Sequence, residues 1–209
     1  YDTITVRVQS NGAITMMIAV ADTRGNVKGY IKEPNVDYKR GSTGEVLVGD
    51  VVGQGWFSVV KDMGLKTPYT GQTPLISGEI GEDLAYYLTT SEQTPSAIGL
   101  NVLLNEDETV KVAGGFLVQV MPDAPDAEIA ALEARIQAMP AISNLLRSHD
   151  HSKAILDAIY GQDQYKILEE SPLAFHCDCS RDRFSDGIKS LGKTEIESLI
   201  TENHGAEII

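Results

Sequence analysis

Apolar and polar residues alternate over long stretches of the first half of the chain, with the two-residue period of β-strands. Ile4, Val6 and Val8 share one face of a predicted strand, and Asn11-Gly12 is a hairpin signal before the next apolar run, at 14–21. The pattern therefore predicts an antiparallel meander, whose further strands lie at 27–31, 55–60, 100–104 and 110–120, the last two paired with each other.

Helical spacing appears once within this part and then dominates after Pro122. Residues 80–88 carry an apolar stripe that predicts a helix lying on the sheet. Of the 19 glycines, 15 precede residue 126, which marks the change from strands and turns to helices. Three short amphipathic helices are predicted: one capped by Asp126 with Ile129, Leu132 and Ile136, one with Ile142, Leu145 and Leu146, and one with Ile155, Leu156 and Ile159 that ends at Gly161.

These elements indicate the α+β class, an antiparallel-sheet core with packed helices. The amphipathic stripes after Pro122 fit either a helical layer buried on the sheet or a surface dedicated to partner binding. Burial is the commoner use of such a stripe, so the periodicity alone favours the helical layer.

Charge and composition exclude several classes of protein. The 209 residues carry a formal net charge of −13, and neither half is basic, so we expect no nucleic-acid partner. The longest nearly unbroken apolar run, at 16–21, is far shorter than a membrane helix, so no membrane partner is expected. Only two cysteines and no targeting pattern favour the cytoplasm. Because the chain begins inside an alternating run and stops on apolar residues, we expect both ends to be cut.

Residues 187–194 fit the phosphate-loop pattern G-x-x-x-x-G-K-[ST] letter for letter. A phosphate loop needs a buried strand before it, whereas residues 180–186 are polar and suit a helix capped by Ser180. Gly192 would then follow that helix, and Thr194 with Glu197 would form a capping box for the next. The context rejects a nucleotide site.

Cys177-Asp178-Cys179 is the strongest chemical signal from the residues alone. Two thiolates at this spacing can bind a soft metal ion or close a disulfide, although tetrahedral zinc requires four ligands and the chain has only these two cysteines. Arg181, Arg183 and a helix start at Ser180 would favour the thiolate form. Metal binding, thiol exchange and two unremarkable thiols remain open at this point.

The motif Phe-His-Cys-Asp-Cys-Ser-Arg-Asp-Arg at residues 175–183 resembles the F-x-C-x-C-S-R-x-R signature of the heat shock protein 33 family. Stretches at 69–83, 91–95 and 114–122 resemble the same family in the same order. The resemblance covers essentially the whole chain, and several motifs in one order are more specific than a lone Cys-x-Cys.

The resemblance implies a core chaperone domain at 1–123, a helical linker at 124–170 and part of a zinc-binding redox switch at 171–209. Cys177 and Cys179 would be two of four zinc ligands, the other two coming from a later Cys-x-x-Cys that this sequence lacks. In that family, oxidation replaces zinc binding by disulfides, unfolds the linker, and yields an ATP-independent holdase that dimerises.

The expected function is therefore a cytoplasmic, redox-regulated chaperone that is not an enzyme and binds unfolding client proteins. The alternative is a thiol–disulfide oxidoreductase that uses Cys177 and Cys179 as an exchange pair. Because short helices are marginal in water, their release would expose a client-binding surface of Ile129, Leu132, Ile136, Leu145, Leu146, Ile155 and Ile159.

Overall fold

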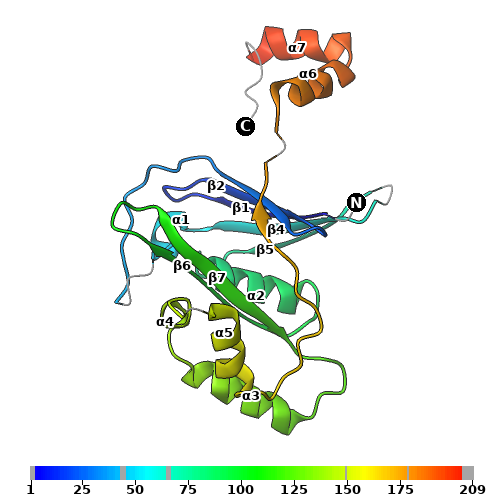
Figure 1. Cartoon of the computed structure of the whole chain (residues 1–209). Coiled ribbons are helices and arrows are strands. Elements are labelled where there is room, and N and C mark those ends of the chain that lie inside the picture. The colour runs from blue at the N-terminus through cyan, green and yellow to red at the C-terminus, as the bar shows by residue number, and fades with distance from the viewer. Residues whose placement is uncertain (1–2, 43–45, 65–66, 149, 178, 204–209) are drawn as a thin grey trace.

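The fold is built on two β-sheets, antiparallel except where β8 joins β3, in a computed structural model that describes residues 3–42, 46–64, 67–148, 150–177 and 179–203. Within these residues the larger sheet has the strand order β5-β4-β1-β2-β3-β8 and the smaller one pairs β6 with β7 (Figure 1). The strands are β1 Thr3–Ser10, β2 Met16–Asp22, β3 Asn26–Ile31, β4 Gly55–Asp62, β5 Tyr69–Pro74, β6 Ser96–Leu104, β7 Val110–Gln119 and β8 Ala174–Phe175.

In the part of the chain that the structure describes, five helices precede β8, and α6 and α7 follow it at the C-terminal end, away from the sheets (Figure 1). None of those in the described residues is long and apolar enough to cross a membrane. They are α1 Gly49–Val52, α2 Ile80–Thr90, α3 Asp126–Ala138, α4 Ile142–Leu145, α5 His151–Tyr160, α6 Arg181–Ser190 and α7 Lys193–Asn203.

The larger sheet buries one face beneath α2. Val8, Phe57 and Val59 are buried and lie with Tyr87 of α2 in one apolar cluster. The rings of Phe57 and Tyr87 lie with their centroids 5.9 Å apart. The alternation along β1 and the helical stripe of α2 thus meet as the sequence predicts.

A second apolar cluster joins the helical layer to the smaller sheet. Leu103 of β6 and Val118 of β7 are buried together with Leu146, Ile155 and Ile159. The predicted pairing of 100–104 with 110–120 is confirmed by the antiparallel register of β6 and β7. In this conformation the helical stripes are packed against a sheet, as the periodicity favours.

At three positions, one β-turn and two helix starts, the local structure differs in detail from the sequence prediction. Strands β1 and β2 pair antiparallel, but Asn11-Gly12 lies in a longer loop docked on α1, where the Gly12 N–H donates to the Val52 carbonyl at 2.9 Å. A Cβ at Gly12 would overlap that carbonyl, so close approach demands the glycine. Asp126 is the first residue of α3 rather than its cap. Likewise Thr194 lies inside α7, which begins one residue earlier, so no capping box forms there.

Candidate functional site

The cysteine pair follows a short strand that joins the C-terminal segment to the larger sheet. Strand β8 lies parallel to β3, with Ala174 opposite Asn26 and Phe175 opposite Val27. The Ala174 N–H donates to the Gly25 carbonyl at 3.0 Å, and the His176 N–H donates to the Val27 carbonyl at 2.9 Å. Cys177 is therefore placed one residue beyond the last of these bonds, at the edge of the sheet.

Both thiols are exposed at the start of a helix. Cys177 and Cys179 are exposed, and α6 begins two residues after Cys179. The predicted cap is confirmed, because the Ser180 hydroxyl accepts a hydrogen bond from the Arg183 N–H at 3.2 Å. The start of α6 and the residues Arg181 and Arg183 follow the pair closely, and a helix N-terminus with nearby cations is the setting of many reactive cysteines. Both thiols thus have the exposure that reactive cysteines require.

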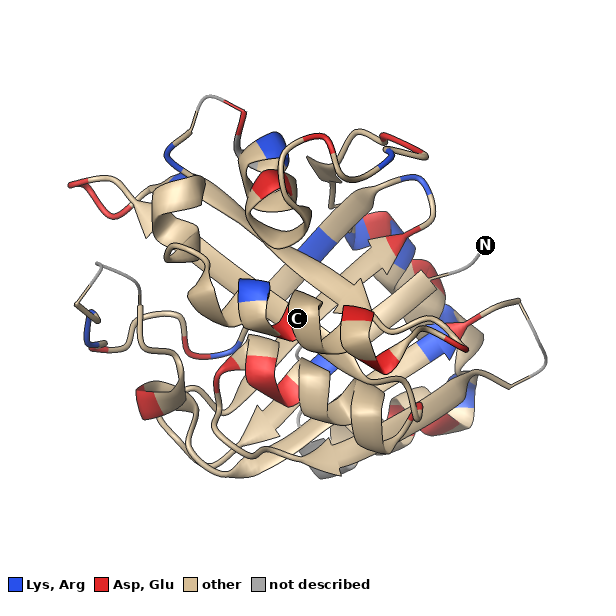
Figure 2. Cartoon of the chain, turned by 90° about the horizontal axis from the view of Figure 1, so that it is seen from below, with Lys and Arg blue, Asp and Glu red and all other residues tan. Residues whose placement is uncertain are grey.

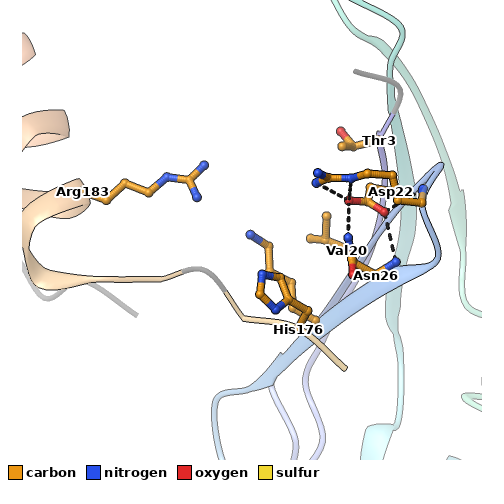
Figure 3. A pocket seen from close by; sticks show the side chains of 8 residues that line it. Thr3, Val20, Asp22, Asn26, His176 and Arg183 are labelled. Carbon is orange, nitrogen blue, oxygen red and sulfur yellow. Dashed lines mark hydrogen bonds and ion pairs between the residues drawn. The ribbon is translucent and has the colours of Figure 1, made fainter. Parts of the chain in front are cut away.

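A hollow of about 300 Å³ lies between this segment and the β2–β3 turn (Figure 3). It is bordered by Arg24 of the β2–β3 turn, by Lys28 of β3, by His176 after β8, and by Arg183 from α6. Arg24 and Lys28 thus lie on one side of the hollow, and Arg183, which follows the cysteines, lies on the other. Sequence inspection does not reveal this hollow, because Arg24 and Arg183 are remote in the chain.

Asp22 organises the turn that presents Gly25 to β8. Its carboxylate accepts hydrogen bonds from the backbone N–H groups of Arg24 at 2.9 Å and Asn26 at 3.0 Å, and from the Asn26 side-chain amide at 2.9 Å. The Asn26 side-chain bond and the Arg24 bonds hold the pKa of Asp22 well below its usual range. Gly25 adopts a φ of 81°, and a Cβ there would overlap the Pro172 carbonyl oxygen.

We expect this turn to contribute pH-dependent stability. Because the folded pKa of Asp22 is depressed, its contribution is present above the unfolded pKa of about 4 and declines as the pH falls below it. The melting temperature of Asp22→Asn should lie below that of the unmodified protein at pH 7, with the gap shrinking from pH 4 towards pH 2. Thermal melts across this range check it, and a gap independent of pH would contradict the ionic role of Asp22.

The segment before β8 is fastened to α5 by a polar cluster. The Tyr165 hydroxyl donates to an Asp157 carboxylate oxygen at 2.9 Å, and Lys153 donates to the same oxygen at 3.2 Å. The bond to Asp157 raises the pKa of Lys153, and burial raises that of Tyr165. Tyr165 also lies against Tyr160, with ring centroids 6.2 Å apart. Only the Lys153–Asp157 spacing hints at this cluster in the sequence.

The cysteine pair fits a zinc site in the kind of ligand but not in number. Thiolates are ligands that zinc prefers, and a structural site has four of them or a mixture with histidine. Among the described residues no group of three or more His, Cys, Asp and Glu side chains is arranged to hold a metal ion. This part of the chain therefore offers two thiolates of a possible four.

The phosphate-loop pattern is rejected by the structure, as its context predicts. Residues 187–190 are the last turn of α6, and Lys193 and Thr194 begin α7. Gly192, with a φ of 84°, makes the bend between the two helices. The segment that precedes this motif is a polar helix instead of a buried strand, so it does not form a phosphate cradle.

Comparison with solved structures defines the class of protein. The fold matches the crystal structure of the 33 kDa chaperonin (HSP33) of Thermotoga maritima with a TM-score of 0.82 and 36% sequence identity, over 96% of this chain and 69% of that one. This is the fold of a chaperone. The sequence matches the family described as Hsp33 protein over residues 1–209, and the chain belongs to this family.

Curated relatives agree with that assignment. The 33 kDa chaperonin of Lactococcus lactis subsp. cremoris strain SK11 is 60% identical over 207 residues, which are 99% of this chain and 72% of the relative. The 33 kDa chaperonin of Streptococcus thermophilus strain LMD-9 is 59% identical over 206 residues, again 99% of this chain and 72% of the relative. The resemblance inferred from the Cys-x-Cys motif is thereby confirmed, as is the α+β class.

Proposed function

We propose that this chain acts as an ATP-independent holdase that binds unfolding client proteins once Cys177 and Cys179 are oxidised. The observation that carries the proposal is the exposed thiol pair between β8 and the Ser180-capped helix α6. Membership of a chaperone family supports client binding as the activity. The position of the thiols next to a weakly attached strand supports redox control of it.

The oxidation is a two-electron step. Each thiol gives up one electron and one proton, an S–S bond forms between Cys177 and Cys179, the O–O bond of hydrogen peroxide breaks, and two water molecules leave. The thiolate is the reacting form, which the cations Arg181 and Arg183 and the start of α6 favour.

In the reduced state Cys177 and Cys179 would be two zinc ligands in 171–209, with two further thiolates from the later Cys-x-x-Cys that the family resemblance implies. Zinc, when bound, supplies folding free energy on the order of 10 kcal/mol to a small domain. Both cysteines are exposed and contribute little packing of their own, so this part of the chain depends on such a cross-link.

The proposed client-binding surface is the apolar stripe of the linker, 124–170. Leu146, Ile155 and Ile159 are buried against β6 and β7 in the present conformation, so the surface forms only when the helices leave the sheet. Helix α4 has four residues and α3 has no buried residue, so neither is stable alone. The remaining members are Ile129, Leu132, Ile136 and Leu145.

The partners are accordingly unfolding polypeptides and, in the activated state, a second copy of the chain in the cytoplasm. Figure 2 shows Lys and Arg interspersed with Asp and Glu in that view, instead of forming one basic stripe. With a net charge of −13, this distribution supports a role without nucleic acid or membrane.

The test compares reduced and peroxide-treated protein expressed from its native gene. Oxidised protein should suppress the light scattering of a thermally unfolding client such as citrate synthase without ATP, and the reduced form with zinc should do so poorly. Equal suppression by the two forms would refute the switch.

A thiol–disulfide oxidoreductase is the second candidate, favoured by the exposed thiols at the start of α6. Steady turnover of a small dithiol substrate, lost in Cys177→Ser, would establish this activity. The two cysteines would then be explained by catalysis instead of by a redox switch of the chaperone.

A further inference from the structure

Strand β3 has an outer edge that β8 covers only in part. Backbone groups of a strand alternate between its two sides, and the carbonyls of Gly25 and Val27 face β8. The N–H and C=O groups of Gly29 and Ile31 therefore face the same way. Within the described residues, β8 pairs only with Asn26 and Val27, so this edge continues past the end of β8.

The hold of β8 on this edge is weak. Both of its residues are exposed, and the side chains of Leu173 and Phe175 are 79% and 76% exposed, so the segment buries little apolar surface. Backbone hydrogen bonds set its register, among them the bonds from Ala174 to Gly25 and from His176 to Val27. Each contributes only about 1 kcal/mol net, so another extended chain can displace β8.

We propose that the outer edge of β3, from Gly25 to Ile31, binds extended segments of client polypeptides by strand addition, and that β8 occupies it as an internal competitor. This inference rests on the proposed holdase function and names how a client is held. The parallel register of β8 shows that the edge accepts a strand.

Strand addition suits a binder of many sequences. Main-chain hydrogen bonds are available to every residue type except proline, which lacks the N–H, and an unfolding protein exposes backbone groups that its own fold no longer pairs. Gly25 lets a partner backbone approach closely, as the Pro172 carbonyl does.

The test removes the competitor without an oxidant. Ala174→Pro deletes the N–H that bonds Gly25 and should release β8, whereas Leu168→Pro introduces the same residue at an 85% exposed position of the same segment. The probe is reduced, carboxymethylated α-lactalbumin, which is permanently unfolded. Under reducing conditions we expect Ala174→Pro to bind it at least about tenfold more tightly than the unmodified protein does, and Leu168→Pro to show no gain.

Amide hydrogen exchange then locates the client. In Ala174→Pro the amides of Val27, Gly29 and Ile31 should exchange quickly and become protected about tenfold or more when the probe binds. The Lys28 amide faces β2 and serves as the internal control.

Two results would overturn the edge site and leave the holdase proposal standing. The first is that the probe binds without protecting these three amides. The second is that the oxidised protein binds the probe while Ala174→Pro binds it no more tightly than the unmodified protein does. If neither Ala174→Pro nor the oxidised protein binds the probe, both proposals fail.

Discussion

Replacing Ile159 by alanine is expected to remove about 2–5 kcal/mol from the stability of the helical layer and to let the reduced protein bind clients. Ile159 is 1% exposed and lies in the cluster that joins α5 to β6 and β7. The truncation removes methyl groups from this contact and leaves a cavity that the four-residue helix α4 cannot fill by itself.

The loss should be confined to one of the two clusters. Because Ile159 does not belong to the cluster of Phe57 and Tyr87, amides of α5 should exchange faster while those of α2 stay protected. Denaturant unfolding, amide exchange and client light scattering measure the three effects. Ile167→Ala, at a 53% exposed position, is the matched control and should change stability by no more than about 0.5 kcal/mol.

The two readouts can disagree in an informative way. A destabilised helical layer in Ile159→Ala, with no client binding by the reduced protein, would show that the stripe of α3, α4 and α5 is not the client surface.

Replacing both cysteines by serine is expected to abolish the response to peroxide. The double variant Cys177→Ser with Cys179→Ser has no thiol in residues 1–209 to oxidise and lacks both proposed zinc ligands of this chain. Zinc per chain, measured colorimetrically after denaturation, should fall from about one to background, since a site with half its thiolates lost holds the metal poorly. Both side chains are exposed and neither belongs to the cluster of Phe57 and Tyr87, so that cluster should melt as before.

Reversal by dithiothreitol in the unmodified protein is the control for irreversible damage by peroxide. Persistent activation of the double variant by peroxide would place the switch on other residues, and unchanged zinc content would remove these cysteines from the metal site.

Sequence pattern predicts the parts of the fold whose side chains themselves enter a core. Val8 on β1 and Tyr87 on α2 follow strand and helix periods and are buried where those periods place them. Strand β5 escapes such inspection because its buried positions are Gly71 and Thr73, which supply no apolar alternation. It is one of the two edge strands of its sheet, a position that tolerates proline.

The candidate site shows the same division. The Cys-x-Cys motif and the Ser180 cap are local and are readable from the sequence, whereas β8 depends on a contact between Gly25 and Ala174 across the chain. Two exposed residues carry no periodicity from which such a strand could be predicted. The role of Asp22 is equally hidden, because an Asp before a glycine turn is common and only the folded turn shows how many donors converge on it.

The polar cluster at Tyr165 limits how far the thiols can travel. Cys177 lies twelve positions after Tyr165, so with β8 detached and the contacts to Lys153 and Asp157 intact, Cys177 stays within about 40 Å of Tyr165. A tether of this length keeps the local concentration of the segment high near its own sheet edge, on the order of millimolar. Return of β8 after reduction is then a rapid intramolecular event that does not depend on protein concentration.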